Sequence, residues 1–391
     1  MSHSPLHGVR VIELARILAG PWAGQTLADL GADVIKVESP DGGDDTRKWG
    51  PPFVTDQDGE NLSAAYYHSC NRGKRSIAVD FSKPEGAEIV RKLVAGADVL
   101  IENFKLGGLK KYGLDYESVR RLNPRLVYCS ITGFGQSGPY APRAGYDFIV
   151  QGMSGLMSIT GPAGGEPQKV GVAVTDLFTG LYSVIAIQAA LRHAEATGQG
   201  QHIDMALFDA QISVLANQNL NFLVSGNSPA QMGNAHPNIA PYEVLPAADG
   251  HFILAVGNDG QFQKFCKTVG LDALPQDPDF ATNAARVANR VRLREKMVAA
   301  LANFERLPLL AKLDAAGVPA SPINTISEMF SDPQAIARGM RLNLDDGHGN
   351  RLPSVRSPML MSETPLTYRS PSPRLGEHTE EILAELEKNQ K

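Results

Sequence analysis

Residues 9–38 read VRVIELARILAGPWAGQTLADLGADVIKVE. Two apolar runs, Val9–Leu14 and Asp33–Glu38, enclose a segment in which Gly20-Pro21 precedes Trp22–Leu30. Proline is tolerated in the first turn of a helix, and the glycine that follows Leu30 is a stop signal. The pattern predicts a strand, a helix and a second strand, and a unit of this kind implies a parallel sheet.

The same alternation continues along the chain. Apolar runs of strand length alternate with segments of helical periodicity, which predicts an α/β fold with a doubly wound, Rossmann-like sheet. In such a sheet ligands bind at the carboxyl ends of the strands. Ser82 and Glu85 have the spacing of a capping box at the start of the next helix. The further strands are predicted at Ser76–Asp80, Val99–Asn103, Arg125–Thr132 and His202–Leu207.

The length of 391 residues is too great for one ordinary core, so two domains are expected. From about Val224 the amino-acid composition changes. Residues Ser225–Pro241 are rich in Gly, Asn, Pro and Ser, which is typical of a crossing between domains. Short strands and helices follow. They predict a smaller α+β domain.

Composition excludes several classes of protein. A net charge of −5 argues against a general nucleic-acid binder. We expect no membrane span, because no uninterrupted apolar run approaches about 18–20 residues, and the N-terminus lacks a signal or transit pattern. The three cysteines lack CxxC spacing and the nine histidines lack HExxH spacing, so no metal site is predicted and a reducing cytoplasm is the expected location.

One carboxylate stands out in the stretch Val174–Tyr182. Asp176 precedes a long helical pattern from Leu177 to His193, so it lies at or beside a helix N-terminus. The first interpretation is a helix cap, because Asp is a preferred cap residue. The second is a carboxylate nucleophile that forms a covalent intermediate. Position alone favours the cap.

Two glycine-containing segments follow predicted strands. Asn103–Gly113 joins a glycine pair to three lysines, and it reads either as a solvated face or as a phosphate clamp. Gly133–Gly138 is a literal GxGxxG, but prolines rather than a helix follow it, and it comes late in the chain. It therefore fails the context that a dinucleotide fingerprint requires.

The chain resembles the class III CoA-transferases, the family of formyl-CoA transferase and carnitine CoA-transferase. The resemblance spans nearly the whole sequence, and its motifs are specific through their common order and spacing. These motifs are Ala19-Gly20-Pro21, Leu27-Ala28-Asp29-Leu30-Gly31-Ala32, Asn71 with Lys74-Arg75-Ser76, Glu102-Asn103-Phe104, Gly145-Tyr146-Asp147, Asp176, and Gly376 with His378-Thr379.

The resemblance implies a domain plan and a mechanism. Residues 1–224 and 326–391 would form a large Rossmann-like domain around a small domain of residues 225–325, and two subunits would interlock as a homodimer. Asp176 would attack an acyl-CoA thioester, giving a mixed anhydride and then an aspartyl-CoA thioester, from which an acceptor carboxylate takes the CoA. Acyl-CoA and a carboxylic acid would be the substrates, with no tightly bound cofactor, no nucleic acid and no membrane partner.

The resemblance also suggests binding positions. Asn103, Phe104 and Lys111 match CoA-contacting positions, and Gly257-Asn258-Asp259-Gly260 matches a glycine loop thought to shield the intermediate from water. Ala19, Tyr146 and Asp147 lie in the family motifs and are also assigned to CoA binding. Arg47, in a long polar loop, is predicted to contact a phosphate.

Three rival functions fit the same resemblance. A related α-methylacyl-CoA racemase uses a Gly-His-Asp motif, but this chain has Tyr146 in place of that His, and an unperturbed Tyr is a poor base near neutral pH. A CoA-linked isomerase or lyase is the second rival, and a non-catalytic acyl-CoA-binding protein is the third. Residues 255–262 resemble relatives that use succinyl-CoA with dicarboxylates, which suggests such substrates.

Overall fold

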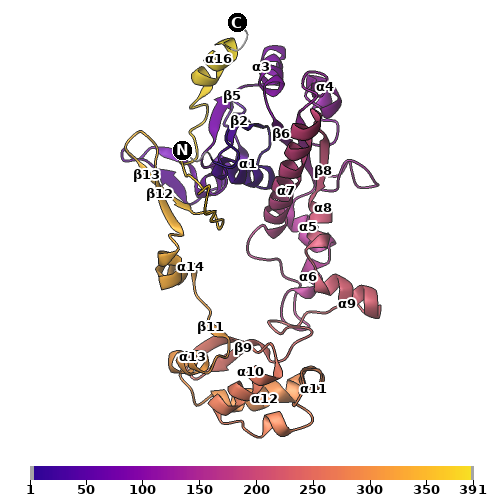
Figure 1. The fold of residues 1–391 in the computed structure, drawn as a ribbon, viewed down its shortest axis with the longest axis vertical. Coiled ribbons are helices and arrows are strands. Elements are labelled where there is room, and N and C mark those ends of the chain that lie inside the picture. The colour runs from indigo at the N-terminus through magenta and orange to yellow at the C-terminus, as the bar shows by residue number, and fades with distance from the viewer. Residues whose placement is uncertain (1–3, 389–391) are drawn as a thin grey trace. The chain divides into compact units, whose positions relative to one another are not determined.

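The computed structural model describes residues 4–388, which form two compact units (Figure 1). The small unit comprises Met157–Gln168 and Gly226–Pro333, and the rest of the chain forms the large unit. The first crossing lies one residue from the predicted boundary. The return comes after Pro333 rather than after residue 325, and Met157–Gln168 joins the small unit although we assigned it to the large domain.

Within the described residues, a six-stranded parallel sheet forms the centre of the large unit. Counted along the chain, its strands take the order 3-2-1-4-5-6, the order of the doubly wound fold. The direction of winding reverses between β1 and β6, so the loops after these two strands open the crevice in which such folds bind ligands. From edge to edge the strands are β5 (Arg75–Ala78), β2 (Asp33–Glu38), β1 (Arg10–Glu13), β6 (Val99–Glu102), β7 (Val127–Thr132) and β8 (His202–Ala206).

Helices cover both faces of this sheet (Figure 1). Successive strand residues point to opposite faces, so Val11 joins one core cluster and Ile12 the other. Because both faces are buried, the strands read as continuous apolar runs. One face packs against α1 (Ala19–Asp29), α5 (Asp147–Met153), α7 (Val174–Thr197) and α8 (Leu207–Ser213), and the other against α3 (Pro84–Ala95), α4 (Tyr116–Val119) and α16 (Thr379–Lys388).

Helix α7 lies along α1 (Figure 1). Gly180 permits the close approach, because a Cβ at this position would lie 2.7 Å from the carbonyl oxygen of Ala19. By length and composition α7 is also apolar enough to cross a membrane, contrary to the expectation that no such stretch exists. We interpret α7 as a core helix, because its buried residues, among them Val184 and Ile187, pack into the large unit.

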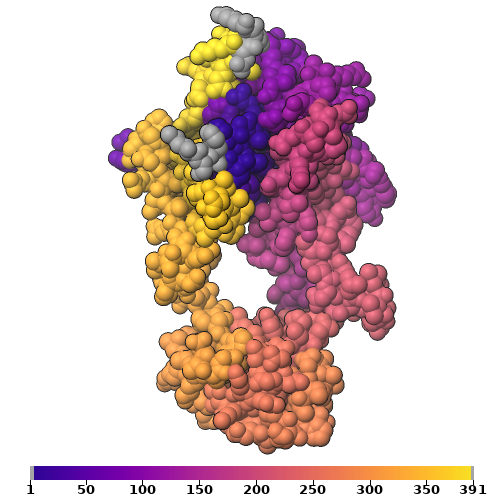
Figure 2. Space-filling view, viewed as in Figure 1, coloured from indigo at the N-terminus to yellow at the C-terminus, as the bar shows by residue number. Residues whose placement is uncertain are grey.

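The C-terminal tail covers the edge strand β5 and lies beside the N-terminal part of the large unit (Figure 2). The Ser76 N–H donates to Nδ1 of His378 at 3.2 Å, and the Ala78 N–H donates to Oγ1 of Thr379 at 3.0 Å. The motif around His378 and Thr379 therefore satisfies an otherwise unpaired strand edge. The predicted capping box is wrong: the Ser82 hydroxyl donates to Asp80, and Lys83 is the N-cap of α3.

The small unit has its own core, built around Phe252, Phe262 and Phe265. An antiparallel sheet of β11 (Ala320–Pro322), β10 (Gly250–Ala255) and β9 (Tyr242–Ala247) packs with α10 (Asp259–Val269), α12 (Arg290–Leu301) and α13 (Arg306–Ala315). The other described elements are η1 (Asp45–Lys48), β3 (Phe53–Thr55), β4 (Asn61–Ala64), α2 (Ala65–His68), η2 (Lys110–Tyr112), α6 (Leu156–Ile159), α9 (Asn217–Ser225), η3 (Leu274–Gln276), α11 (Asn283–Ala288), α14 (Ile326–Ser331), α15 (Pro333–Ala337), β12 (Arg341–Asp345) and β13 (Arg351–Val355).

Candidate active site

Asp176 lies in the first turn of α7 and is half-buried. Among the described residues, none donates a hydrogen bond to its carboxylate, and no cation lies beside it. Burial raises the pKa of Asp176 to about 7, and the negative charge of Asp147 adds to the rise. A carboxylate with so little stabilisation is unusual in a folded protein, and such groups concentrate at functional sites.

Asp147, not Asp176, caps helix α7. The Thr175 N–H donates to Oδ1 of Asp147 at 2.9 Å, and Nε2 of Gln151 donates to Oδ2 at 2.7 Å. The Thr175 hydroxyl donates to Oε1 of Gln211 at 2.8 Å, which ties the same turn to α8. The interpretation of Asp176 as a helix cap is therefore wrong, because Asp147 from another helix accepts the capping hydrogen bond. Within the part of the chain that the structure describes, the Asp176 carboxylate makes no hydrogen bond that stabilises the helix.

Tyr66 is a site residue that the sequence did not reveal. Burial and the charge of Asp176 raise the pKa of Tyr66 to about 12, so its hydroxyl stays protonated. In the described structure this hydroxyl has no hydrogen-bond partner. Its ring packs edge-on against Trp49 at 5.3 Å between centroids. Tyr66 thus offers a free donor near the carboxylate, and no sequence spacing links it to Asp176.

The loops at the switch point are held together by Asn103. Its Oδ1 accepts from the Arg16 N–H at 3.0 Å and its Nδ2 donates to the Arg16 carbonyl at 2.7 Å, so it joins the loop after β6 to the loop after β1. The next residue, Ile17, has a φ of +73°, which is strained for a β-branched side chain. Strained backbone of this kind clusters at ligand sites, and Ala19 begins α1 directly behind it.

A buried charge network fixes this strained loop. The Lys36 ammonium, fully buried, contacts Glu13 at 3.0 Å, Asp44 at 2.9 Å and the Ala15 carbonyl at 2.8 Å. Burial works against ionisation of Asp44, but the positive charge of Lys36 lowers the pKa of Asp44 to about 2. Asp44 in turn accepts from the Ile17 N–H at 3.3 Å. The network therefore stabilises the conformation that the loop after β1 requires.

Arg47 belongs to a buried structural pair rather than to an open surface. Its guanidinium forms a two-pronged contact with Glu38 at 2.9 and 2.7 Å, and Nη2 also donates to the Tyr67 hydroxyl at 2.6 Å. The guanidinium also stacks on the Tyr67 ring at 3.7 Å from its centroid. These contacts commit Arg47 to the core and speak against the predicted phosphate contact. Arg16, half-exposed and 2.9 Å from Asp45, is a cation nearer the switch point.

Segment 104–110 covers a cavity of about 230 Å³ at the sheet face. The Phe104 N–H donates to Oε2 of Glu102 at 2.7 Å, and the Arg16 guanidinium lies 5.8 Å from the centroid of the Phe104 ring. Lys111 is exposed, with its ammonium over the Tyr112 ring at 4.7 Å. A solvated lysine of this kind is compatible with either interpretation of the segment, so the phosphate clamp stays a prediction.

Two further predictions meet different local structures. The Tyr146 side chain is 61% exposed, so it is accessible to a ligand from solvent. The expected glycine loop is largely the start of α10: the Asn258 side chain caps the helix through the Gln261 N–H at 2.9 Å, and Asp259 pairs with Arg286 at 2.7 Å. The helix begins at Asp259, and the contact of Asp259 with Arg286 anchors its first turn. The role of the loop near an intermediate stays a prediction.

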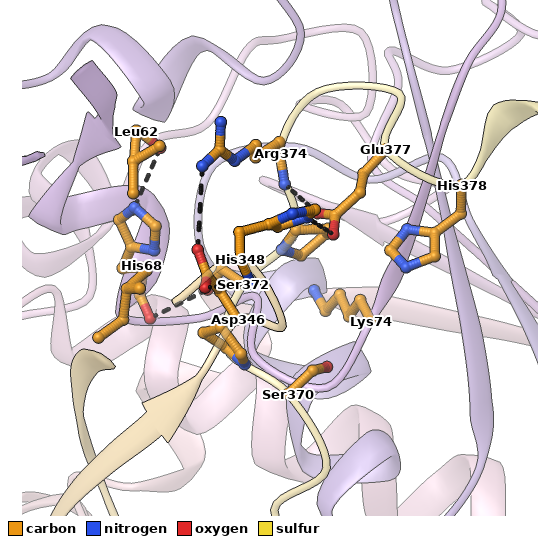
Figure 3. Close-up of a pocket in the computed structure, with 13 residues that line it drawn as sticks. Leu62, His68, Lys74, Asp346, His348, Ser370, Ser372, Arg374, Glu377 and His378 are labelled. Carbon is orange, nitrogen blue, oxygen red and sulfur yellow. Dashed lines mark hydrogen bonds and ion pairs between the residues drawn. The ribbon is translucent and has the colours of Figure 1, made fainter. Parts of the chain in front are cut away.

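A second cavity in the large unit is lined by the tail and by α2 (Figure 3). Its volume is about 40 Å³, room for a few water molecules rather than an organic substrate. Nε2 of His68 lies 3.2 Å from the Leu62 carbonyl, and burial lowers the pKa of His68 to about 4. His348 and Glu377 face each other at 3.6 Å nearby (Figure 3). This cavity is not a candidate active site.

Comparison with known proteins assigns the chain to a family. The sequence model of CoA-transferase family III matches residues 6–379. The chain belongs to CoA-transferase family III. As a member it is an enzyme that transfers CoA between an acyl-CoA and a free carboxylic acid, which removes the non-catalytic function from consideration.

Several relatives of this family III enzyme are similar over nearly its whole length. A succinate–glutarate CoA-transferase of Agrobacterium fabrum is 64% identical, covering 98% of this chain and 96% of the relative. A succinyl-CoA:glutarate CoA-transferase of Mus musculus is 42% identical, covering 98% and 87%. The crystal structure of a CAIB/BAIF family protein from Brucella suis is 60% identical with a TM-score of 0.88, covering 98% and 100%.

Proposed function

We propose that this CoA-transferase exchanges CoA between succinyl-CoA and a free dicarboxylic acid of the glutarate class, through covalent intermediates on Asp176. The observation that carries the mechanism is the half-buried, uncompensated carboxylate in the first turn of α7. The names of the Agrobacterium fabrum and Mus musculus relatives support the substrate class.

The reaction starts with an attack of the Asp176 carboxylate on the thioester carbonyl carbon. The carbon–sulfur bond breaks, CoA leaves as a thiolate, and a mixed anhydride remains. The thiolate then attacks the Asp176 carbonyl, which releases the donor acid and leaves an aspartyl-CoA thioester. An acceptor carboxylate attacks that thioester, CoA leaves again, and its final attack on the acceptor acyl carbon forms the new acyl-CoA and restores Asp176.

The residues around Asp176 fit these steps. A carboxylate that accepts no hydrogen bond keeps its lone pairs available, and binding beside the thioester supplies the effective concentration that a weak nucleophile needs. The protonated Tyr66 hydroxyl can donate to the oxyanion of the tetrahedral intermediate. Asp147 holds the helix turn in place through the Thr175 N–H.

CoA would lie across the switch point between β1 and β6. Asn103 and Ala19 frame this crevice, Phe104 offers an aromatic face beside Arg16, and Lys111 offers a point charge for a phosphate. Tyr146 and Asp147 precede and begin α5, whose first turn is bonded to the turn that carries the nucleophile. No tightly bound cofactor is needed for any of these steps.

Trapping tests the mechanism. The enzyme is incubated with succinyl-CoA and then with hydroxylamine, which converts an aspartyl thioester or anhydride into a hydroxamate. Peptide mass spectrometry should find that hydroxamate at Asp176, and the enzyme should lose activity in parallel. Asp209, an exposed first-turn aspartate of α8, serves as the matched control and should stay unmodified. A hydroxamate elsewhere, or none after full turnover, would refute the covalent route.

We also propose that two subunits interlock as a homodimer in the cytoplasm. Helices α5, α7 and α9 expose many large apolar side chains, and exposed apolar side chains that gather on a surface mark interaction sites. Ile185 on α7, 62% exposed, is one of these side chains. Sedimentation velocity should give a dimer for the wild type and a monomer for Ile185→Asp, whereas Leu122→Asp, at an isolated exposed leucine, should stay dimeric. The exposed apolar side chains of these three helices are Phe148, Ile149, Met153, Phe178, Leu181, Tyr182, Ile185, Leu220, Phe222, Leu223 and Val224.

A further inference from the structure

The proposed substrates carry a second carboxylate that the reaction never uses. This distal group stays ionised near neutral pH, and the charge that acts most strongly on Asp176 is another negative one, that of Asp147. A dicarboxylate therefore enters a site whose own charge repels it. A cation about one acyl chain away from the nucleophile would offset this repulsion without pairing with Asp176 itself.

The segment before Asp176 is folded back onto α5 by two hydrogen bonds, and a third hydrogen bond within α5 connects the two acceptor residues. The Val170 N–H donates to Oε1 of Gln151 at 2.9 Å, and Nε2 of that residue donates to Oδ2 of Asp147 at 2.7 Å. Oδ1 of Asp147 accepts from the Thr175 N–H at 2.9 Å. Because Gln151 and Asp147 are four residues apart on one helix, they share a face, and both ends of segment 170–175 are anchored to that face.

Lys169 directly precedes this anchored segment. It is exposed, and its ammonium donates to the Val170 carbonyl at 3.3 Å. Among residues 4–388 it forms no ion pair with a carboxylate. Two other arginines of the large unit are already paired with carboxylates: Arg47 with Glu38, and Arg16 with Asp45. Lys169 is thus a cation beside the nucleophile's own loop that retains its capacity to bind a carboxylate.

We propose that Lys169 binds the distal carboxylate of the acyl group and so selects dicarboxylic over monocarboxylic substrates; this rests on the proposed transferase reaction at Asp176. Through the three hydrogen bonds, the amide nitrogens of Val170 and Thr175 lie within roughly 13 Å of each other. A lysine stem reaches about 6 Å, a five-carbon diacid spans about 5 Å between its carboxyl carbons and a hydrogen bond adds about 3 Å, so together they cover about 14 Å, which is enough to link the two ends of this segment. No cation of the described chain contributes to the pKa of Asp176, so Lys169 does not pair with the resting carboxylate.

The test compares glutaryl-CoA with pentanoyl-CoA, which have the same chain length and differ in the distal carboxylate. The measured quantity is kcat/KM for formation of the trapped Asp176 adduct. Lys169→Met should lower the value for glutaryl-CoA by roughly ten-fold or more and leave that for pentanoyl-CoA unchanged, because a charge-assisted hydrogen bond is lost. Lys169→Arg should restore most of the preference. Lys92→Met, an exposed lysine on α3, is the matched control and should behave as wild type.

The outcomes separate the two proposals. A wild-type enzyme that forms no adduct with either thioester refutes the transferase mechanism. An active wild type in which Lys169→Met reduces both thioesters equally, or neither, overturns the assignment of Lys169 alone. Where pentanoyl-CoA reacts too slowly to measure, inhibition by free glutarate and by free pentanoate supplies the second readout, and Lys169→Met should weaken only the inhibition by glutarate.

Discussion

Replacement of Asp176 by Asn should stabilise the protein while it abolishes transfer. The side chain keeps its shape and loses its charge. Burial and the charge of Asp147 raise the pKa of Asp176 from 3.8 to about 7, so the folded state binds this proton more tightly than the unfolded chain does. At about 1.36 kcal/mol per pKa unit, ionisation of Asp176 would lower the free energy of unfolding by at most about 4 kcal/mol. Because Asp176 is only half-buried, solvent screening reduces this, and we expect about 1–2 kcal/mol.

Because the pKa of Asp176 is raised on folding, the pH range in which the free energy of unfolding changes follows directly. At about pH 3 and below, the carboxyl is mostly protonated in both states, so Asp176→Asn should be about as stable as the wild type. Between about pH 4 and pH 7 the unfolded chain releases the proton and the folded state retains it, so the wild type loses stability. Above pH 7 the difference should be constant. Urea denaturation midpoints, measured at equal protein concentration at pH 4 and pH 8, give the comparison.

Activity provides the companion measurement. The wild-type kcat/KM for succinyl-CoA should rise with pH through about 7 as the carboxylate ionises, and Asp176→Asn should show no turnover above background. A stability difference that is equal at pH 4 and pH 8 would refute the raised pKa. A variant that still transfers CoA would refute the role of Asp176 as nucleophile.

Three further substitutions test the surrounding structure. Asn103→Ala removes both hydrogen bonds to the Arg16 backbone, so KM for acyl-CoA should rise about ten-fold with a smaller change in kcat; an unchanged KM would remove the switch-point site. Tyr66→Phe keeps the ring and removes the hydroxyl, so kcat should fall about 10- to 100-fold with little change in KM, and an equal kcat would exclude the oxyanion role. Gly180→Val places a side chain against the Ala19 carbonyl, so thermal denaturation should show a loss of about 1–3 kcal/mol, and unaltered stability would mean that the two helices are not closely packed.

The sheet could be predicted because its strands are buried on both faces. Continuous apolar runs mark them, and β2 was predicted with the bounds that the structure has. The boundaries of short segments were predicted less accurately. Ser82 and Glu85 have a capping spacing, yet the Ser82 hydroxyl bonds Asp80 and the helix starts at Pro84. Local patterns of this kind fail when two nearby acceptors compete for one hydroxyl.

The site residues also differ in whether the sequence could identify them. Asp176 could be singled out because it precedes a long helix and belongs to a set of family motifs. Tyr66 and Lys169 could not be assigned, because their relation to Asp176 depends on tertiary folding. Arg47 shows the converse error: an arginine in a polar loop suggested an open phosphate contact, but Glu38 and Tyr67 engage it in the core. Sequence supplies the charge of a residue, whereas its partners come only with the fold.

Buried charges in this protein differ in whether an opposite charge compensates them, and this difference separates structural residues from the proposed catalytic one. Lys36 is buried completely, and it is matched by Glu13 and Asp44, so its charge strengthens the loop that forms the switch point. Asp176 receives no such compensation, because the charge that acts most strongly on it is the negative one of Asp147, which is held in place as an acceptor from the Thr175 N–H. Burying an unpaired charge raises the free energy of the folded protein. That cost is removed in any state in which the group is uncharged. In the proposed mechanism, acylation supplies such a state, because an acyl adduct on Asp176 would leave its carboxyl group uncharged and relieve the repulsion from Asp147. The free-energy penalty borne by the resting carboxylate therefore favours the covalent intermediate over the free enzyme, which is the direction the first half-reaction must take.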